Sequence, residues 1–338
     1  MNNTNKILQT NKKSLEDFVL KKFCKFNFVM VLLVFLVPLF VSCKKKEAEV
    51  ELPQNISINE NDNEPNLRVY DVNTKKIKEM GLETYLQGVL AGEMFNNRPL
   101  EALKAQAILA RTYTLYFLQN LSSKYDGADI SNDISEAQAY DESKINDNIK
   151  KAVDETKGLV VTCDGNLIES WFHSNSGGKT TTARYGLNYL GEETYTQITT
   201  SKENETNSEN YLWTTILTKS EILSTLRQMG VKIDTISSFE VGERDDSGRA
   251  ITLKVGSSEF SANTFRIKVG STKMKSTMIE SIVVSASSVS VSGKGYGHGV
   301  GMSQWGAKIM AEDGKTAEEI IKHYFKDVEV YLSNYVNK

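Results

Sequence analysis

The amino-acid sequence predicts an α+β fold in which a helical hairpin packs against β-hairpins and short antiparallel sheets, with a cleft between two lobes. Apolar residues recur at helical spacing between Leu82 and Leu121, and the spacing changes to period two after residue 158. Turn residues then separate short apolar runs towards the C-terminus, and no internal repeat is visible.

The first 42 residues predict a signal sequence. Six lysines precede an apolar run over residues 28–41, which is short for a membrane span but has the length of a signal-peptide core. Ser42 then precedes Cys43, and this pair resembles the bacterial lipoprotein signal, in which cleavage leaves Cys43 lipid-modified. Phe40 stands where leucine is usual, so ordinary secretion or a short membrane anchor is the alternative. In each case we expect an exported protein, and the lipid would anchor it to a membrane of the bacterial cell envelope.

The composition of the remaining chain narrows the class of protein. Removing 42 of the 338 residues leaves 296, with Cys163 as the only cysteine besides Cys43, so no intramolecular disulfide is expected. The removed segment carries six lysines against two acidic residues, which takes the net charge from −3 to −7 and argues against nucleic acid as a partner. Residues 43–66 predict a flexible tether, and residues 67–331 predict the ordered domain.

Two helices are predicted at the start of that domain. The first runs from Leu82 to Leu90 and stops before Glu93, and the second begins near Pro99 and continues to Leu121. Their connection would place Glu93 at the mouth of a helical hairpin, where partial shielding raises the pKa of a carboxyl group. A capping or surface glutamate is the alternative on spacing alone.

A polar stretch over residues 124–150 precedes a predicted β-hairpin of residues 158–163 and 167–172 around Asp164-Gly165. Its second strand leads into residues 173–180, where a histidine, hydroxyls, paired glycines and a lysine predict an edge that contacts a ligand. A polar turn is the alternative. Further short strands and one helix are predicted over residues 219–229, 237–243, 249–255 and 281–292.

Glycine alternates with reactive side chains near the C-terminus, in the sequence GYGHGVGMSQWG (295–306). Alternating glycines let the backbone lie close to a ligand or to another segment, and His298 stands in the middle of this run. A tight loop that packs under a helix is the alternative.

Four blocks of the sequence resemble the SpoIID/LytB family, named after stage II sporulation protein D. They are LETYLQGVLAGEMFNNRPLEALKAQAILARTYTLY (82–116), FHSNSGGKTTTARYG (172–186), SGRAITLKV (247–255) with NTFRIKVG (263–270), and GKGYGHGVGMSQWGAKIMAEDGKTAEEIIKHYF (293–325). The blocks follow the family order and cover nearly all of residues 67–331, which is more specific than any single motif.

The resemblance implies a peptidoglycan lytic transglycosylase. The glutamate of the family's A-x-E-M sequence is catalytic, and here it falls on Glu93. Ordinary glycosidases use two carboxyl groups, whereas a lytic transglycosylase can use one because the sugar's own 6-hydroxyl replaces water. Glu93 would protonate the bond between N-acetylmuramic acid and N-acetylglucosamine, and would then take the proton of the 6-hydroxyl as a 1,6-anhydro ring closes. A pKa near the working pH suits this double role.

The other site residues are expected to contact the sugar, acetamido or lactyl groups of the glycan. They are Arg111, Tyr113, His173, Ser176, Lys179, Tyr296, His298 and Gln304. Arg111 and Tyr113 could instead orient Glu93 or make a helix–helix hydrogen bond. Trp305 is expected to anchor the core, and the glycine-alternating run would form one wall of the glycan cleft.

Some members of the family bind zinc through a segment that precedes a Q-x-Y sequence. The corresponding stretch here, from Asp129 to Tyr140, has neither cysteine nor histidine and so lacks the ligands of a closed zinc site. We therefore expect no metal and no cofactor, with packing of this segment in place of the ion. A zinc hydrolase is a third candidate function, and metal analysis would detect it.

The main rival function belongs to another class. Members of the LytB kind act as enhancers of cell-wall amidases, so the chain could be a non-catalytic glycan-binding partner of such an amidase. A binding module has no need of Glu93, and its presence favours the enzyme.

Overall fold

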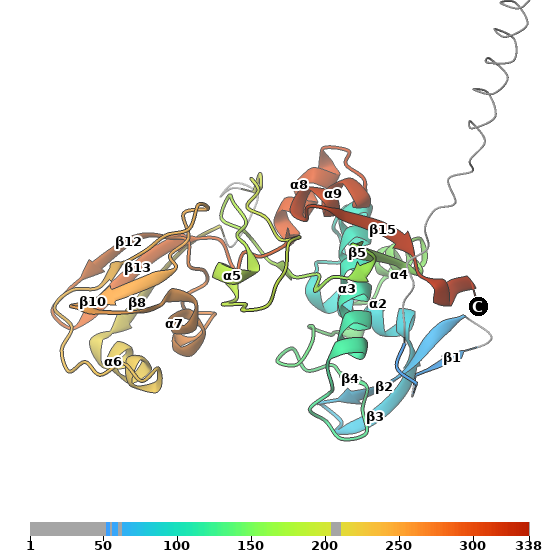
Figure 1. The fold of residues 1–338 in the computed structure, drawn as a ribbon, viewed down its shortest axis with the longest axis horizontal. Helices are drawn as coiled ribbons and strands as arrows, with labels where there is room; N and C mark the ends of the chain where they lie inside the picture. Colours follow the sequence, from blue (N-terminus) through green and yellow to red (C-terminus); the bar gives the residue numbers. More distant parts are fainter. Residues whose placement is uncertain (1–51, 55, 60–62, 204–210, 338) are drawn as a thin grey trace, which may run out of the picture. The chain divides into compact units, whose positions relative to one another are not determined.

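Helices and small sheets alternate along the chain, which confirms the α+β class (Figure 1). The computed structural model describes residues 52–54, 56–59, 63–203 and 211–337. The expected signal sequence, the lipidation at Cys43 and much of the expected tether lie outside the described residues. Among the described residues, no helix has both the length and the apolar character that a bilayer span requires.

The first sheet lies at the beginning of the described chain. Its strands are β1 (Ser57–Asn59), β2 (Glu64–Asp71) and β3 (Lys76–Gly81), which pair antiparallel, and β4 (Ile130–Ser131), which runs parallel to β2. Leu67 and Val69 alternate with outward residues and are buried, as a half-buried strand requires. Because β1 and β2 begin before Leu67, ordered structure starts earlier than the predicted boundary at residue 67.

The predicted helical hairpin is confirmed by α2 (Leu82–Glu93) and α3 (Leu100–Asn120). Leu86 is completely buried in α2, and Ala107 and Ala110 are completely buried in α3, where their small side chains allow close packing. The first helix ends at Glu93, close to the point where the apolar spacing stops.

Part of the predicted hairpin is confirmed and part is shorter than expected. The turn at Asp164 and Gly165 has φ of 50° and 84°, values that suit a two-residue hairpin turn. The sheet is built from β5 (Leu159–Cys163), β6 (Asn166–Leu167) and β15 (Val328–Leu332). β6 has only two residues because the chain then leaves this sheet, and Phe172 and His173 form β7, which pairs elsewhere.

The first hydrophobic core lies around α3. Further helices around this core are α4 (Asp147–Asp154), α8 (Gln304–Glu312) and α9 (Ala317–Tyr324). The polar stretch 124–150 also contains η2 (Glu142–Lys144), and the described chain closes with η3 (Asn334–Asn337). Tyr335 is 1% exposed and its hydroxyl donates to Glu83 Oε1 at 3.3 Å, so the ordered domain extends past the predicted end at residue 331.

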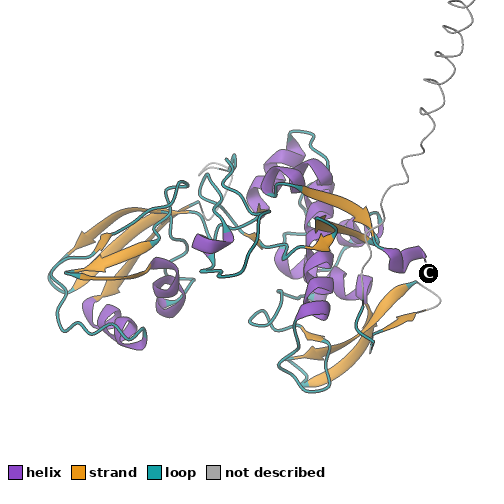
Figure 2. Ribbon diagram, viewed as in Figure 1, coloured by secondary structure: helices purple, strands orange, loops and turns teal. Residues whose placement is uncertain are grey.

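The second hydrophobic core belongs to residues 212–294. Its elements are β8 (Leu212–Thr218), α6 (Lys219–Gln228), β9 (Glu240–Val241), β10 (Thr252–Val255), β11 (Ser258–Ser261), α7 (Ala262–Val269), β12 (Ile279–Val284) and β13 (Ser288–Lys294). Two antiparallel sheets and two helices enclose this core (Figure 2). The predicted helix at 219–229 is confirmed, whereas the region 281–292 contains a turn between β12 and β13.

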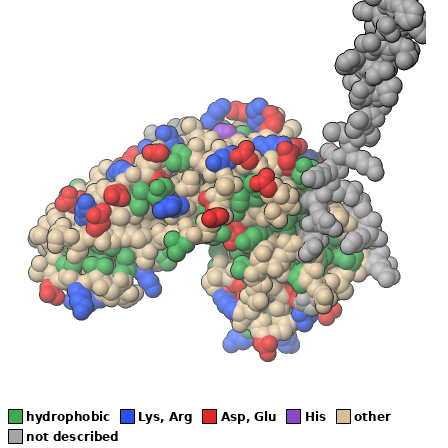
Figure 3. Space-filling model, viewed as in Figure 1, with side chains coloured by type: hydrophobic (Ala, Val, Ile, Leu, Met, Phe, Trp, Pro, Cys, Tyr) green, Lys and Arg blue, Asp and Glu red, His purple; other side chains and the backbone are tan. Residues whose placement is uncertain are grey.

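Charged side chains of both signs are interspersed over the face of the molecule in view (Figure 3). The residue census agrees, with 40 basic and 43 acidic residues in the whole chain. The face in view carries no large region of one charge that would mark a binding surface.

Candidate active site

Glu93 is half-buried as the last residue of α2. Burial raises the pKa of its carboxyl group, and hydrogen bonds from Ala139 and Gln304 oppose that rise. The C-terminal end of a helix carries partial negative charge, which also disfavours a carboxylate. The environment therefore favours the neutral acid more than water does.

The segment 138–140 crosses α2 directly beside this carboxyl group. The backbone N–H of Ala139 donates to Glu93 Oε1 at 2.7 Å. A Cβ on Gly92 would lie 2.6 Å from the Tyr140 nitrogen, and one on Gly88 would lie 2.1 Å from the Tyr140 ring. Two glycines one helical turn apart thus create the surface on which this segment lies. The sequence gives no local signal for that contact, since the partners are 46 residues apart.

Gln304 brings the last sequence block to the same carboxyl group. It is the first residue of α8, and its Nε2 lies 3.5 Å from Glu93 Oε2 and 3.5 Å from Gln106 Oε1. Gln106 comes from α3 and is completely buried. Glu93, predicted as the catalytic residue, and Gln304, predicted as a substrate contact, therefore lie together, and Gln106 is a neighbour that the sequence analysis missed.

The glycine-alternating run packs against the second block. The backbone of residues 296–302 exchanges hydrogen bonds with that of residues 171–181, and Met302 and Ser303 form β14, which pairs in parallel with β7. Gly301 has φ of 68°, and a Cβ there would lie 2.0 Å from the Trp171 carbonyl oxygen. The glycines are therefore required for close packing, which is the loop alternative left open by the sequence. The predicted wall of a glycan cleft remains a prediction.

The two histidines of these segments, His173 and His298, both form hydrogen bonds with the backbone of Val300. Val300 N donates to His298 Nδ1 at 3.1 Å, so His298 carries its proton on Nε2 and donates to the Phe172 carbonyl at 2.9 Å. His173 Nδ1 donates to the Val300 carbonyl at 3.0 Å. Burial and the positive charge of Arg266 lower the pKa of His298 to about 3.

His173 has the same neutral character, and its pKa lies well below the usual value because burial, together with the positive charge of nearby Arg249, disfavours its protonated form. It is 4% exposed. Both histidines were predicted as substrate contacts, but in this structure they join the second block to the last block. The physical reason is that the glycines bring the two backbones within hydrogen-bond distance of the imidazole rings.

Ser176 is also placed differently from the prediction of a sugar contact. It is completely buried, and its backbone N–H and hydroxyl donate to Glu203 Oε1 at 2.6 and 2.5 Å. The same oxygen accepts from Ser303 Oγ at 2.9 Å, and Ser303 caps α8 by accepting from Gly306 N at 3.2 Å. Glu203 therefore fixes the start of α8 next to Gln304. The sequence analysis missed it because a single glutamate in a polar stretch carries no signal.

Arg111 lies in a buried ion pair and not beside Glu93. Its Nε and Nη2 donate to the two carboxylate oxygens of Glu83 at 2.9 and 2.6 Å, and its Nη1 donates to the Leu159 carbonyl at 3.1 Å. Arg111 is completely buried, so it has no surface with which to contact a sugar in this structure. This geometry is the helix–helix alternative, and it ties α2 to α3.

The remaining predicted contacts have exposed surface. Tyr113 is half-buried beside Phe117, and burial raises the pKa of its hydroxyl to about 12. Lys179 is exposed, and Tyr296 is half-buried with Lys275 Nζ 5.6 Å from its ring centre. Trp305, expected in the core, is half-buried and lies under the guanidinium group of Arg98 at 3.9 Å.

The stretch from Asp129 to Tyr140 does not fit a zinc ion. Asp129 forms an ion pair with Arg68, Gln138 Nε2 donates to Thr114 Oγ1 at 3.1 Å, and Tyr140 stacks on Tyr85. Nowhere in the described parts of the chain do three or more His, Cys, Asp or Glu side chains gather in a way that could hold a metal.

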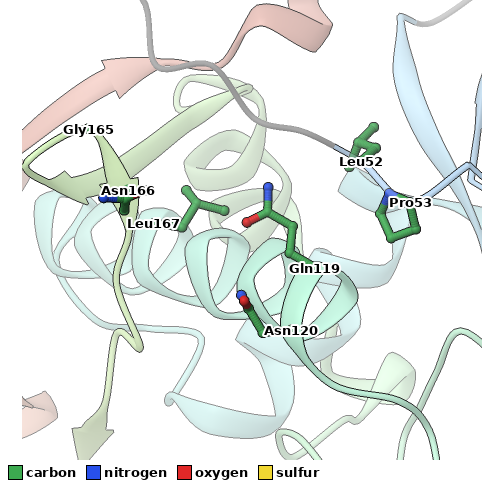
Figure 4. Close-up of a pocket in the computed structure, with 7 residues that line it drawn as sticks. All are labelled: Leu52, Pro53, Gln119, Asn120, Gly165, Asn166 and Leu167. Atoms are coloured by element: carbon green, nitrogen blue, oxygen red, sulfur yellow. The ribbon is translucent and has the colours of Figure 1, made fainter. Parts of the chain in front are cut away.

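A cavity of about 600 Å³ lies at the far end of α3 (Figure 4). Its lining residues are Leu52, Pro53, Gln119, Asn120, Gly165, Asn166 and Leu167. Gln119 follows Gln106 by 13 residues of the same helix, which corresponds to about 20 Å along its axis. The cavity is therefore separate from the Glu93 site.

Two family descriptions match successive parts of the chain. Residues 70–163, which hold Glu93, match the family described as SpoIID, Stage II sporulation protein, and residues 167–301 match a domain of unknown function, DUF8618. The chain is 32% identical over 271 residues to an uncharacterized protein of Brachyspira hyodysenteriae, covering 78% of this chain and 70% of that protein.

Two named relatives come from Bacillus. Stage II sporulation protein D of Bacillus amyloliquefaciens is 30% identical over 291 residues, covering 80% of this chain and 81% of that protein. The amidase enhancer of Bacillus subtilis is 29% identical over 291 residues, covering 71% of this chain and 39% of that protein.

The fold and the site define an α+β protein with a shielded glutamate at the end of a helical hairpin, reached by a glycine-rich block more than two hundred residues away. Stage II sporulation protein D is similar to this chain over most of both proteins. The chain belongs to the SpoIID family.

Proposed function

We propose that this protein is a peptidoglycan lytic transglycosylase in which Glu93 is the single acid–base residue. The observation that carries the proposal is the environment of Glu93, whose pKa is raised by burial while Ala139 holds one of its oxygens at 2.7 Å. Membership of the SpoIID family supports a substrate in the cell wall.

The first step uses Glu93 as an acid. Because the Ala139 N–H donates to Oε1, the proton of the neutral carboxyl group is held on Oε2. Oε2 donates that proton to the glycosidic oxygen between N-acetylmuramic acid and N-acetylglucosamine. The bond from C1 to that oxygen breaks, and the leaving sugar departs with a free 4-hydroxyl.

The second step uses the same group as a base. The Glu93 carboxylate accepts the proton of the 6-hydroxyl of N-acetylmuramic acid while O6 bonds to C1. The 1,6-anhydro ring closes, Glu93 is protonated again, and no water is consumed. One carboxyl group suffices because each proton that it donates is returned in the same turnover.

Gln304, Tyr113, Lys179 and Tyr296 remain the proposed substrate contacts, since each has exposed surface. Arg111, His173 and Ser176 are buried and support the site through the bonds described above, whereas His298 is half-buried and also remains a proposed substrate contact. We also retain the proposal of an exported protein with a lipid anchor at Cys43, and of residues 67–331 as the approximate catalytic domain.

The reaction is tested by incubating the full chain with purified glycan strands, with and without stem peptides, and analysing the products by mass spectrometry. Wild type should produce 1,6-anhydro ends, Glu93→Gln should produce none, and Glu79→Gln, an exposed glutamate on β3, should act as wild type. Strands that bind wild type without yielding anhydro ends would contradict the enzymatic proposal.

A second candidate function rests on the similarity to the amidase enhancer of Bacillus subtilis. In this alternative the chain binds glycan and stimulates a separate cell-wall amidase without cutting the strand. Amidase release of stem peptides would then be stimulated equally by wild type and Glu93→Gln. Stimulation that disappears in Glu93→Gln favours the enzyme.

A further inference from the structure

Phe95, Arg98 and Trp305 form a cluster of two aromatic rings and one guanidinium group, and they are close in sequence to Glu93 and Gln304. The Arg98 guanidinium carbon lies 4.9 Å from the centre of the Phe95 ring and 3.9 Å from the centre of the Trp305 ring. These distances are those of cation–π contacts. The backbone N–H of Arg98 donates to the backbone carbonyl of Phe95 at 3.1 Å. This tight turn sets the two side chains beside each other.

The cluster and the candidate catalytic group are built from the same two chain segments. Phe95 follows Glu93 by two residues, a distance of at most about 7 Å along the chain. Trp305 follows Gln304, whose Nε2 lies 3.5 Å from Glu93 Oε2. Trp305 is also fixed by its backbone N–H, which donates to the Ser174 carbonyl at 3.1 Å. The cluster and the carboxyl group therefore come from the same two short segments of the chain, which meet at the contact between Gln304 and Glu93.

The cluster presents apolar surface to solvent. Phe95 is 59% exposed, and Trp305 and Arg98 are half-buried. A single exposed aromatic residue needs no explanation by itself. Here, however, the exposed ring belongs to a fixed stack beside a shielded carboxyl group, and the flat apolar face of a ring is suited to the C–H face of a pyranose.

The same cluster carries positive charge in an acidic protein. The Nζ of Lys308 lies 6.0 Å from the Trp305 ring centre and also pairs with Glu312 at 2.6 Å. A guanidinium group has five N–H donors in a planar fork, so it can bind a carboxylate while it makes other contacts. Cationic and aromatic groups together match a ligand that is both a sugar and an anion.

We propose that Phe95, Arg98 and Trp305 form a subsite for a carboxylate-bearing sugar next to the cleaved bond. The pyranose ring stacks on Phe95, Arg98 binds the carboxylate, and Trp305 holds Arg98 in place. The inference rests on the proposed function, because it takes Glu93 as the residue at the cleaved bond. In peptidoglycan the carboxylate belongs either to the lactyl group of a bare N-acetylmuramic acid or to a stem peptide.

The test measures dissociation constants of the full chain in a Glu93→Gln background, so that bound strands remain intact. The ligands are glycan strands without stem peptides, strands that carry them, and chitin oligosaccharides, which have no carboxylate. Adding Arg98→Gln should weaken binding to at least one kind of carboxylate-bearing strand by about tenfold or more, with less than a twofold change for chitin oligosaccharides. The strand that is affected identifies the source of the carboxylate.

Two further variants separate the parts of the subsite. Phe95→Ala should weaken all three ligands, because each presents a pyranose face. Arg98→Lys keeps the charge but not the planar fork. Its dissociation constant for the affected strand should lie between that of Arg98→Gln and that of the parent protein. Arg227→Gln, an exposed arginine of α6, is the matched control and should bind as its parent does.

The subsite and the reaction fail in different ways. Equal loss on all three ligands in Arg98→Gln, or no loss on any, would overturn the subsite even if wild type cleaves glycan strands. If wild type cleaves none while Arg98→Gln loses only carboxylate-bearing strands, the subsite stands and the proposed reaction falls. Thermal melts of each variant show whether an equal loss of binding to all three ligands comes from unfolding. If Arg98→Gln is unfolded, the same comparison of the three ligands is made with Arg98→Lys.

Discussion

At the scale of single residues, Glu93 is subject to opposing influences on its charge. Burial raises the pKa of the carboxyl group, while the Ala139 N–H and Gln304 stabilise the carboxylate. A group that must first donate and then accept a proton benefits from a raised pKa, because more of it is protonated than of an ordinary carboxyl group and its carboxylate is a stronger base. The raised pKa of Glu93 also makes the stability of the protein depend on pH.

We predict that Glu93→Gln stabilises the protein at neutral pH. The pKa of Glu93 in the folded state lies above the unfolded value of about 4.3, so the folded state binds more protons between the two values and stability falls as pH rises through them. Glutamine keeps the acceptor for Ala139 without the charge. Its melting temperature should exceed that of wild type at pH 7, and the difference should shrink at pH 4. If the melting temperature of Glu93→Gln were below that of wild type by the same amount at pH 7 and pH 4, the carboxylate would not be shielded.

The two neutral histidines predict the opposite dependence on acid. Their folded pKa values lie below the unfolded value of about 6.5, so stability is complete above that pH and is lost as pH falls towards the folded values. For His298, whose folded pKa is about 3, the loss should be about 2 kcal/mol between pH 6.5 and pH 5. Denaturant titrations of His298→Gln should show a smaller loss over this window than wild type, although the variant is less stable at pH 7. If the free energy of unfolding of His298→Gln falls with pH as steeply as that of wild type, protonation of His298 is not the cause of the loss.

At the scale of elements, the contact between α2 and the segment 138–140 decides the geometry of Glu93. We predict that Gly92→Ala lowers cleavage at least tenfold, because a Cβ would lie 2.6 Å from the Tyr140 nitrogen and displace the Ala139 N–H from Glu93. The product assay for anhydro ends measures the loss. Thr84→Ala, at an exposed position of the same helix, is the control. Full activity of Gly92→Ala would show that the Ala139 contact is dispensable.

The elements differ in how well the sequence predicts them. Helices α2 and α3 follow from the apolar spacing of residues 82–121, and the turn at Asp164 and Gly165 follows from residue type, because both signals are local. β7 and β14 have two residues each and exist only through their pairing with each other, so no local pattern indicates them. Glu203 and Gln106 were missed for the same reason, since their roles come from partners far away in sequence.

At the scale of the whole molecule, sequence blocks that are far apart meet at one place. Gln304 lies 211 residues from Glu93 in sequence and 3.5 Å from it in space. The second block joins the last block through β7 and β14, and the third block supplies Arg249, whose guanidinium donates to the Ser176 carbonyl. The family order of the blocks did not predict that His173 and His298 would join the second block to the last block, or that Ser176 would bond to Glu203.

The most direct test of the central claim is digestion of purified glycan strands by the full chain in water enriched in ¹⁸O, followed by mass spectrometry of the new ends. Intramolecular attack by the 6-hydroxyl consumes no water, so the account predicts anhydro ends without ¹⁸O from wild type and no new ends from Glu93→Gln. Reducing ends that carry ¹⁸O would mean hydrolysis, and normal cleavage by Glu93→Gln would mean a different acid. Either result would contradict the assignment of Glu93 as the single catalytic residue of a lytic transglycosylase.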